Sequence, residues 1–271
     1  MITVGATVTP ALFTALDSGA VQVDFIKVDA DKGLAVTRRA LAHAPVLIHD
    51  VAYTFWLNYA DPFVPETMHN ARELLNTVNC PWFSTGIGAS AEPQGHTLEY
   101  WRGADAEQLQ PRERCLANIV GNGLRLKAWL SRMPLLLENY NYHPTNAYEY
   151  ICEPDTFSQL IRAIDCGVLL DLAHAQISAF NLQWGDPRLY LDALPLDRVR
   201  EIHVNHPFND GTQMLDRHFP FDESEVALLA WTVANTPVEA VTLESGSPDV
   251  ATLQHELALV RQAVANGQAQ R

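Results

Sequence analysis

Eight short apolar, β-branched runs recur along the chain, and stretches long enough for helices separate them. The runs span residues 2–8, 23–28, 45–51, 82–87, 135–140, 167–172, 199–204 and 240–244. Apolar residues at helical spacing mark intervening segments at residues 32–43, 65–79, 112–132, 153–166 and 249–265. Strands that alternate with helices pack as a parallel sheet. In a chain of 271 residues, eight such strands predict a single TIM-type (β/α)8 barrel domain over residues 1–271.

Charge and composition narrow the class of protein and its partners. The chain carries 32 acidic and 18 basic side chains, a net charge of −14, which opposes binding to nucleic acid and to anionic membranes. Its four cysteines lie far apart without a CxxC pair, so no zinc knuckle or thioredoxin-like motif is present. No segment reads as a signal peptide or approaches the roughly 20 apolar residues of a membrane span. We therefore expect a cytoplasmic protein.

Potential metal ligands stand where several of the predicted strands end. Parallel strands buried on both faces should read as almost unbroken apolar runs, which makes these polar residues conspicuous. They are His49 in PVLIHDV, Glu138 in LLLENY, Asp171 and His174 in VLLDLAH, His203 in REIHVNH and Glu244 in VTLES. The C-terminal ends of barrel strands converge on one cavity, so residues far apart in the sequence are expected to become neighbours there.

The polar segment 205–222, which follows the seventh strand, adds two more candidates. Pro and Gly interrupt this segment too often for a helix, so we predict a loop. Asp216 and His218 are two positions apart, and in an extended segment they project to the same side. We expect this pair to lean over the cavity.

The expected meeting of these eight side chains in one cavity favours a metal site over a set of unrelated core residues. A lone buried His or Asp is more often a hydrogen-bonded core residue than a ligand. Several uncompensated ionisable groups in one cavity would each cost several kcal/mol, whereas a divalent cation balances the carboxylates and binds the imidazoles. Imidazole and carboxylate ligands suit iron, manganese or zinc. Eight candidates exceed one coordination sphere, which favours two or more ions bridged by carboxylates.

The sequence leaves the position of Lys27 and the role of His206 open. Lys27 interrupts the apolar run of residues 23–28 and points either into the top of the barrel or to its solvated rim. His206 stands three positions after His203, and it is equally compatible with a base, a ligand or a hydrogen-bonding residue of the loop.

With these residues assembled, the chain resembles the multinuclear non-haem iron-dependent oxidative enzymes. This family includes the methanobactin biosynthesis oxidase and other tailoring enzymes of ribosomally made peptides. The resemblance rests on LLLENY, CGVLLDLAHAQISAFN, YLDALPLDRVREIHVNHP, MLDRHFPF and VTLESG from residue 135 onward, and on VDFIKV and VLIHDV before it. It implies a xylose-isomerase-like TIM barrel whose metal ligands are His49, Glu138, Asp171, His203, Asp216, His218 and Glu244.

The resemblance also implies an activity. Family members oxidise their substrates with molecular oxygen at a site of two or three iron ions, and manganese or zinc are the alternative metals. The implied substrate is a precursor peptide, frequently modified at a Cys, or a small thiol. A partner protein that presents the peptide is implied as well.

The chain departs from the family pattern at two positions. After the fourth strand the family commonly shows a Ser, an acidic residue and a His, whereas this chain has Ser84, Thr85 and Gly86, so one expected ligand is missing. After the sixth strand His174 stands where the family usually has Asn. Either His174 supplies a ligand from the adjacent wall, or one ion of a three-iron arrangement is absent or altered.

Two other functions use similar ligands. A divalent-metal-dependent sugar isomerase or phosphoesterase of the xylose-isomerase-like or endonuclease-IV-like barrels is the main alternative. A sugar-phosphate substrate would call for basic residues beside the last two strands, where only Arg217 is evident. The second alternative is a non-catalytic metal-binding scaffold protein.

Overall fold

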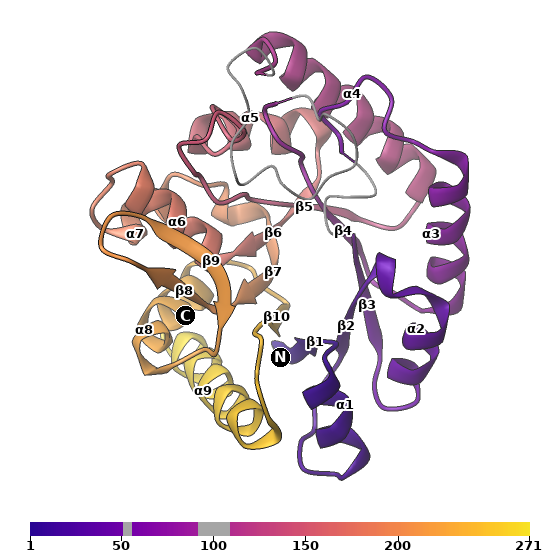
Figure 1. Cartoon of the computed structure of the whole chain (residues 1–271), viewed down its shortest axis with the longest axis vertical. Coiled ribbons are helices and arrows are strands. Elements are labelled where there is room, and N and C mark those ends of the chain that lie inside the picture. Colours follow the sequence, from indigo (N-terminus) through magenta and orange to yellow (C-terminus); the bar gives the residue numbers. More distant parts are fainter. Residues whose placement is uncertain (51–55, 92–108) are drawn as a thin grey trace.

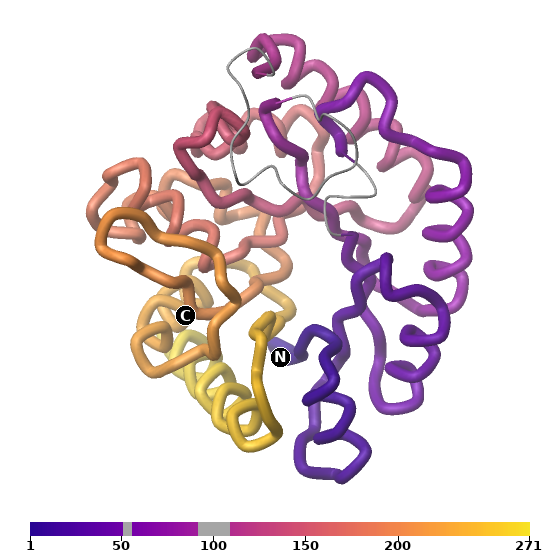
Figure 2. The backbone as a smooth tube through the Cα atoms, viewed as in Figure 1, coloured from indigo at the N-terminus to yellow at the C-terminus, as the bar shows by residue number. Residues whose placement is uncertain are grey.

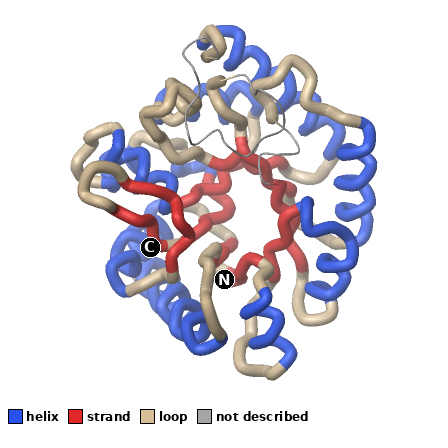
Figure 3. The backbone as a smooth tube through the Cα atoms, in the orientation of Figure 1, coloured by secondary structure: helices blue, strands red, loops and turns tan. Residues whose placement is uncertain are grey.

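Eight parallel strands close a barrel at the centre of the computed structural model, and helices surround it (Figure 1; Figure 3). The structure describes residues 1–50, 56–91 and 109–271. In these ranges the barrel strands are β1 (Thr3–Thr7), β2 (Ile26–Asp29), β3 (Val46–Asp50), β4 (Phe83–Gly86), β5 (Leu135–Glu138), β6 (Gly167–Asp171), β7 (Val199–Val204) and β10 (Ala240–Leu243). All neighbouring strands are parallel, and β10 closes the ring against β1. The predicted barrel is confirmed, and each predicted run overlaps one strand.

Helices follow the strands around the outside of the barrel, as the course of the chain in Figure 2 shows. They are α1 (Pro10–Asp17), α2 (Gly33–Leu41), α3 (Pro65–Thr77), α4 (Arg112–Leu130), α5 (Pro154–Ile164), α6 (Leu172–Asn181), α7 (Pro187–Asp192), α8 (Glu223–Asn235) and α9 (Val250–Gln268). Short 3-10 helices span Ala30–Lys32 and Leu196–Arg198. The five predicted helical segments correspond to α2, α3, α4, α5 and α9. Helices α1, α6, α7 and α8 lie outside the predicted segments. Within the described ranges no helix is long and apolar enough to cross a membrane.

The segment after β7 is the main difference from the prediction. Instead of a loop, it forms an antiparallel hairpin of β8 (His206–Asn209) and β9 (Met214–Phe219). The carboxylate of Asp210 accepts hydrogen bonds from the backbone of Thr212 and Gln213, and Gly211 has a φ of 89°. A Gly at the first central position of the turn suits such a hairpin and is the sequence signal for it. The hairpin rests on α6, where Asn181 bonds both backbone groups of Met214.

Charged residues are buried inside the barrel as well as at its mouth. Lys27 of β2 and Glu201 of β7 are both fully buried and form an ion pair of 2.6 Å. The side chain of Lys27 therefore lies in the interior of the barrel and not at its solvated rim. The four cysteines are free and buried among apolar residues.

The packing of α8 against α9 gives a test of the fold. A Cβ at Gly267 of α9 would lie 2.5 Å from the carbonyl oxygen of Ala230 in α8. We expect Gly267→Ala to lower the free energy of unfolding by about 1–2 kcal/mol, because the overlap outweighs the gain in helix propensity of about 1 kcal/mol.

Gly121 of α4 is the matched control, since a Cβ there meets no atom within 4 Å. We expect Gly121→Ala to raise the free energy of unfolding by up to about 1 kcal/mol. Urea denaturation measures both values. Equal stabilisation by the two substitutions would show that α8 and α9 do not pack as described.

Candidate metal centre

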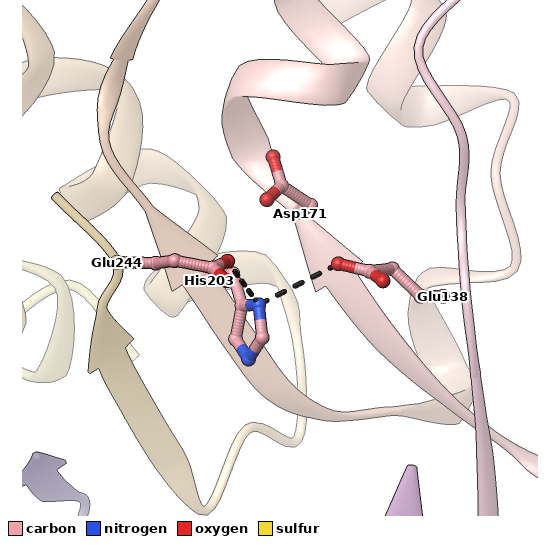
Figure 4. A group of neighbouring side chains, drawn as sticks. All are labelled: Glu138, Asp171, His203 and Glu244. Atoms are coloured by element: carbon pink, nitrogen blue, oxygen red, sulfur yellow. Dashed lines mark ion pairs between the residues drawn. The ribbon is translucent and has the colours of Figure 1, made fainter. Parts of the chain in front are cut away.

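Four ionisable side chains meet at the C-terminal mouth of the barrel (Figure 4). Glu138 and Asp171 are the last residues of β5 and β6, His203 lies in β7, and Glu244 directly follows β10. One ligand atom from each residue lies within 4.8 Å of the others. Asp171 is in register with His203 on the neighbouring strand, so the order of strands in the barrel assembles this group. We call these four residues the central cluster.

Glu138 connects the central cluster to His49 of β3. One carboxylate oxygen, Oε1, lies 3.5 Å from Nδ1 of His203, and the other, Oε2, lies 3.4 Å from Nε2 of His49. Nδ1 of His203 also lies 2.7 Å from Oε2 of Glu244. Figure 4 shows both ion pairs of His203 as dashed lines. The two oxygens of Glu138 thus face two different imidazoles.

The remaining three predicted residues extend the network on its outer side. Asp216 and His218 share strand β9, and the Oδ2 of Asp216 lies 2.9 Å from Nε2 of His218. The same oxygen lies 3.3 Å from Nε2 of His174, which in turn lies 3.9 Å from Oδ2 of Asp171. The structure therefore gathers all eight residues selected from the sequence at the barrel mouth, with Asp171 between His174 and the rest of the central cluster.

Buried atoms without hydrogen bonds show that the centre fits a cation. In the described part of the chain, both ring nitrogens of His203, Oδ2 of Asp171 and Oδ1 of Asp216 are buried and make no hydrogen bond. Leaving such an atom unsatisfied costs about 1–3 kcal/mol. A divalent cation bound by these atoms would remove that cost, and a set of imidazoles and carboxylates suits iron, manganese or zinc.

The sequence of this chain matches one enzyme family over nearly its whole length. The family described as RiPP precursor modification enzyme MbnB/TglH/ChrH, which acts on ribosomally made precursor peptides, matches residues 3–265. The chain belongs to this family. The expected family relationship is confirmed.

The chain is also similar to two UPF0276 proteins and to a solved structure. A UPF0276 protein of Anaeromyxobacter sp. (strain Fw109-5) is 28% identical over 68% of the chain, and the match spans 62% of that relative. A UPF0276 protein of Caulobacter vibrioides is 29% identical over 88% of the chain and 84% of the relative. A xylose isomerase domain protein from Alicyclobacillus acidocaldarius has a TM-score of 0.65 at 13% identity and covers 99% of both chains. This similarity confirms the xylose-isomerase-like fold.

Gly86 on β4 stands where the family pattern has a His ligand, and the packing around it explains why a side chain does not fit there. Gly86 is in register with Glu138, so a side chain at position 86 would point the same way, towards the centre. A Cβ there would overlap the phenol oxygen of Tyr140, which occupies that space. The described residues of β4 therefore offer no ligand at position 86.

A second group of potential ligands is explained by local structure. His206, Asp222 and Glu225 lie together between β8 and the start of α8. Asp222 caps α8 by accepting a hydrogen bond from Ser224, and Glu225 bonds the ring of His206 at 3.0 Å and the amide of Gln176 at 2.6 Å. These contacts anchor the hairpin to α6 and α8. His206 thus has a hydrogen-bonding role in this segment.

Two supporting residues escaped the selection from the sequence. Asn139 bonds both backbone groups of Asp171, with distances of 2.8 and 3.0 Å, and so fixes the end of β6. Its backbone oxygen also lies 2.8 Å from Nδ1 of His174, which turns Nε2 towards Asp216. Glu201 lies two positions before His203, on the same face of β7, and this spacing was the available signal.

Without a bound cation, the carboxylates hold protons on the imidazoles. Burial lowers the pKa of His203, but the charge of Glu244 and the contacts with Glu138 and Glu201 together raise that pKa well above the usual value. Burial also opposes the charge of His218, while its hydrogen bond to Asp216 raises the pKa to about 9. A cation must therefore displace protons from the atoms that it binds.

We expect the affinity for a divalent cation to rise with pH. The pKa of His218 is raised from 6.5 to about 9, so its imidazole loses the proton only as the pH approaches 9, and a metal binds the deprotonated ring. Calorimetric titration with Co²⁺ in buffers of different ionisation enthalpy should show proton release and a higher affinity at the upper end of this range. An affinity that does not change with pH would contradict this ligand assignment.

Proposed function

We propose that this chain is an oxygen-dependent, multinuclear iron oxidase that modifies a precursor peptide, with a Cys of the peptide as the reacting residue. The observation that supports this proposal is the group of four imidazoles and four carboxylates gathered at the barrel mouth, with buried atoms that lack hydrogen bonds. Membership in a family of peptide-modifying enzymes supports the class of substrate.

The arrangement of the donors favours more than one ion. The two oxygens of Glu138 face two neighbouring imidazoles, those of His49 and His203. His174 and His218 both face the same oxygen of Asp216 on the outer side. A carboxylate between two sets of nitrogen donors suits a bridge between cations, which supports a site of two or three ions.

The side chains would hold and tune the metal, and the metal would supply the redox chemistry. When bound, iron supplies the one-electron steps and the activation of oxygen that amino acid side chains do not provide. Glu138, Asp171 and Glu244 balance the positive charge. The low exposure of Asp171 and His203, both 0%, limits the access of bulk water to the central cluster. Asn139 holds Asp171 and His174 in place through its backbone and amide contacts.

The proposal also includes a cellular compartment and a partner protein. We propose that the enzyme works in the cytoplasm, since its four buried cysteines are free thiols, as is usual in a reducing compartment. A partner protein that presents the peptide belongs to the proposal as well. The net charge of −14 opposes the DNA-directed version of the phosphoesterase alternative.

Metal content and oxygen uptake test the proposal together. We expect protein purified anaerobically after iron-supplemented expression to retain iron and to consume oxygen with a Cys-containing candidate precursor peptide, and not with its Cys→Ser form. His203→Ala and Glu138→Ala should lose the iron and lower oxygen uptake by at least about 100-fold, because each removes a ligand.

His255→Ala is the matched control, because His255 is an exposed residue of α9. We expect this variant to keep the iron content and oxygen uptake of the parent protein. One zinc ion per chain without iron would refute the oxidase proposal. Full metal occupancy in both ligand variants would refute the ligand set.

A further inference from the structure

A buried ion pair lies directly beneath the metal centre, inside the barrel. Nζ of Lys27 on β2 lies 2.6 Å from Oε1 of Glu201 on β7, and both side chains are completely buried. The carboxylate also accepts hydrogen bonds from Nε1 of Trp82 at 2.7 Å and from the hydroxyl of Thr242 at 2.8 Å. Three donors from three other strands or strand ends therefore fix the position of the Glu201 carboxylate.

Each member of this pair reaches one imidazole of the centre. Oε1 of Glu201 lies 3.4 Å from Nε2 of His203, on the opposite side of the ring from Glu138 and Glu244. Nζ of Lys27 donates a hydrogen bond of 3.0 Å to the hydroxyl of Ser84, which lies 2.9 Å from Nδ1 of His49. One ion pair thus supports both His203 and His49 from below.

These contacts turn one nitrogen of each ring towards the buried ion pair and the other towards the carboxylates of the centre. Nε2 of His203 faces the Glu201 carboxylate, whereas Nδ1 faces Glu244 and Glu138, so a cation held by these two carboxylates would meet Nδ1. An ammonium group has no acceptor, so the Ser84 oxygen accepts from Lys27. The same hydroxyl contacts Nδ1 of His49, and Nε2 is the nitrogen that faces Glu138.

We propose that Lys27 and Glu201 are positioning residues that direct Nδ1 of His203 and Nε2 of His49 towards the metal. The inference rests on the metal site of the proposed function and not on its oxygen chemistry or its substrate. Partners that bond the outer nitrogen of a ligating His fix its orientation and raise its basicity. A buried ion pair gives little net stability compared with apolar residues of similar size, so stability alone does not explain this pair.

Zinc binding and the nitrogen signals of the histidines test the proposal without iron or oxygen. We expect Lys27→Met and Glu201→Gln each to weaken Zn²⁺ binding by about 10- to 100-fold in calorimetric titrations. In zinc-loaded protein labelled with ¹⁵N in its histidines, long-range ¹H–¹⁵N spectra should show His203 bound through Nδ1 and His49 through Nε2.

The variants should change these signals in a residue-specific pattern. Ser84→Ala should alter the signals of His49 alone, Glu201→Gln those of His203 alone, and Lys27→Met those of both rings. A merely structural role would not separate the two rings in this way. Thr232→Val is the matched control, since it removes a buried hydroxyl that bonds within α8, and should leave zinc affinity unchanged.

Urea denaturation of the zinc-free variants reports whether each one folds. If Lys27→Met does not fold, the uncharged double variant Lys27→Met/Glu201→Gln takes its place, with the same expected loss of affinity. Parental zinc affinity in these variants, or zinc bound through the opposite nitrogen of either ring, would overturn the proposal. Failure of the oxidase proposal alone would leave zinc affinity and nitrogen assignments as expected here.

Discussion

The electrostatic cost of burying carboxylates and imidazoles at the barrel mouth governs the rest of this structure. Glu138, Asp171 and Glu244 project into one small volume with His203, and water cannot solvate the buried members of this group. Such a concentration of charge requires cations nearby. The chain supplies one below the centre, the ammonium group of Lys27, and the donor set above it is suited to metal ions.

The geometry of the barrel places these charged residues close together but at two different levels along its axis. Along β7, Glu201 and His203 are two residues apart, so both side chains face the interior at successive levels. The lower level holds the Lys27 pair, and the upper level holds the proposed metal ligands. The hairpin of β8 and β9 then brings Asp216 and His218 over the mouth from outside the barrel sheet.

The sequence was sufficient to predict the barrel and the meeting of the strand-end residues, because period and burial are local properties of each run. Residues such as Glu138 and Asp171 stood out as charges at the ends of apolar strands. The pairing of Lys27 with Glu201 could not be predicted, because it joins strands that are not neighbours and depends on closure of the ring. The role of Tyr140 in filling the space at Gly86 likewise depends on side-chain packing between strands.

Anomalous diffraction at the iron edge, from crystals of anaerobically iron-loaded protein, tests the central claim most directly. The account predicts at least two iron peaks at the barrel mouth, one of them within ligand distance of Glu138, Asp171, His203 and Glu244. A mouth without iron peaks, or iron bound only elsewhere on the molecule, would contradict it.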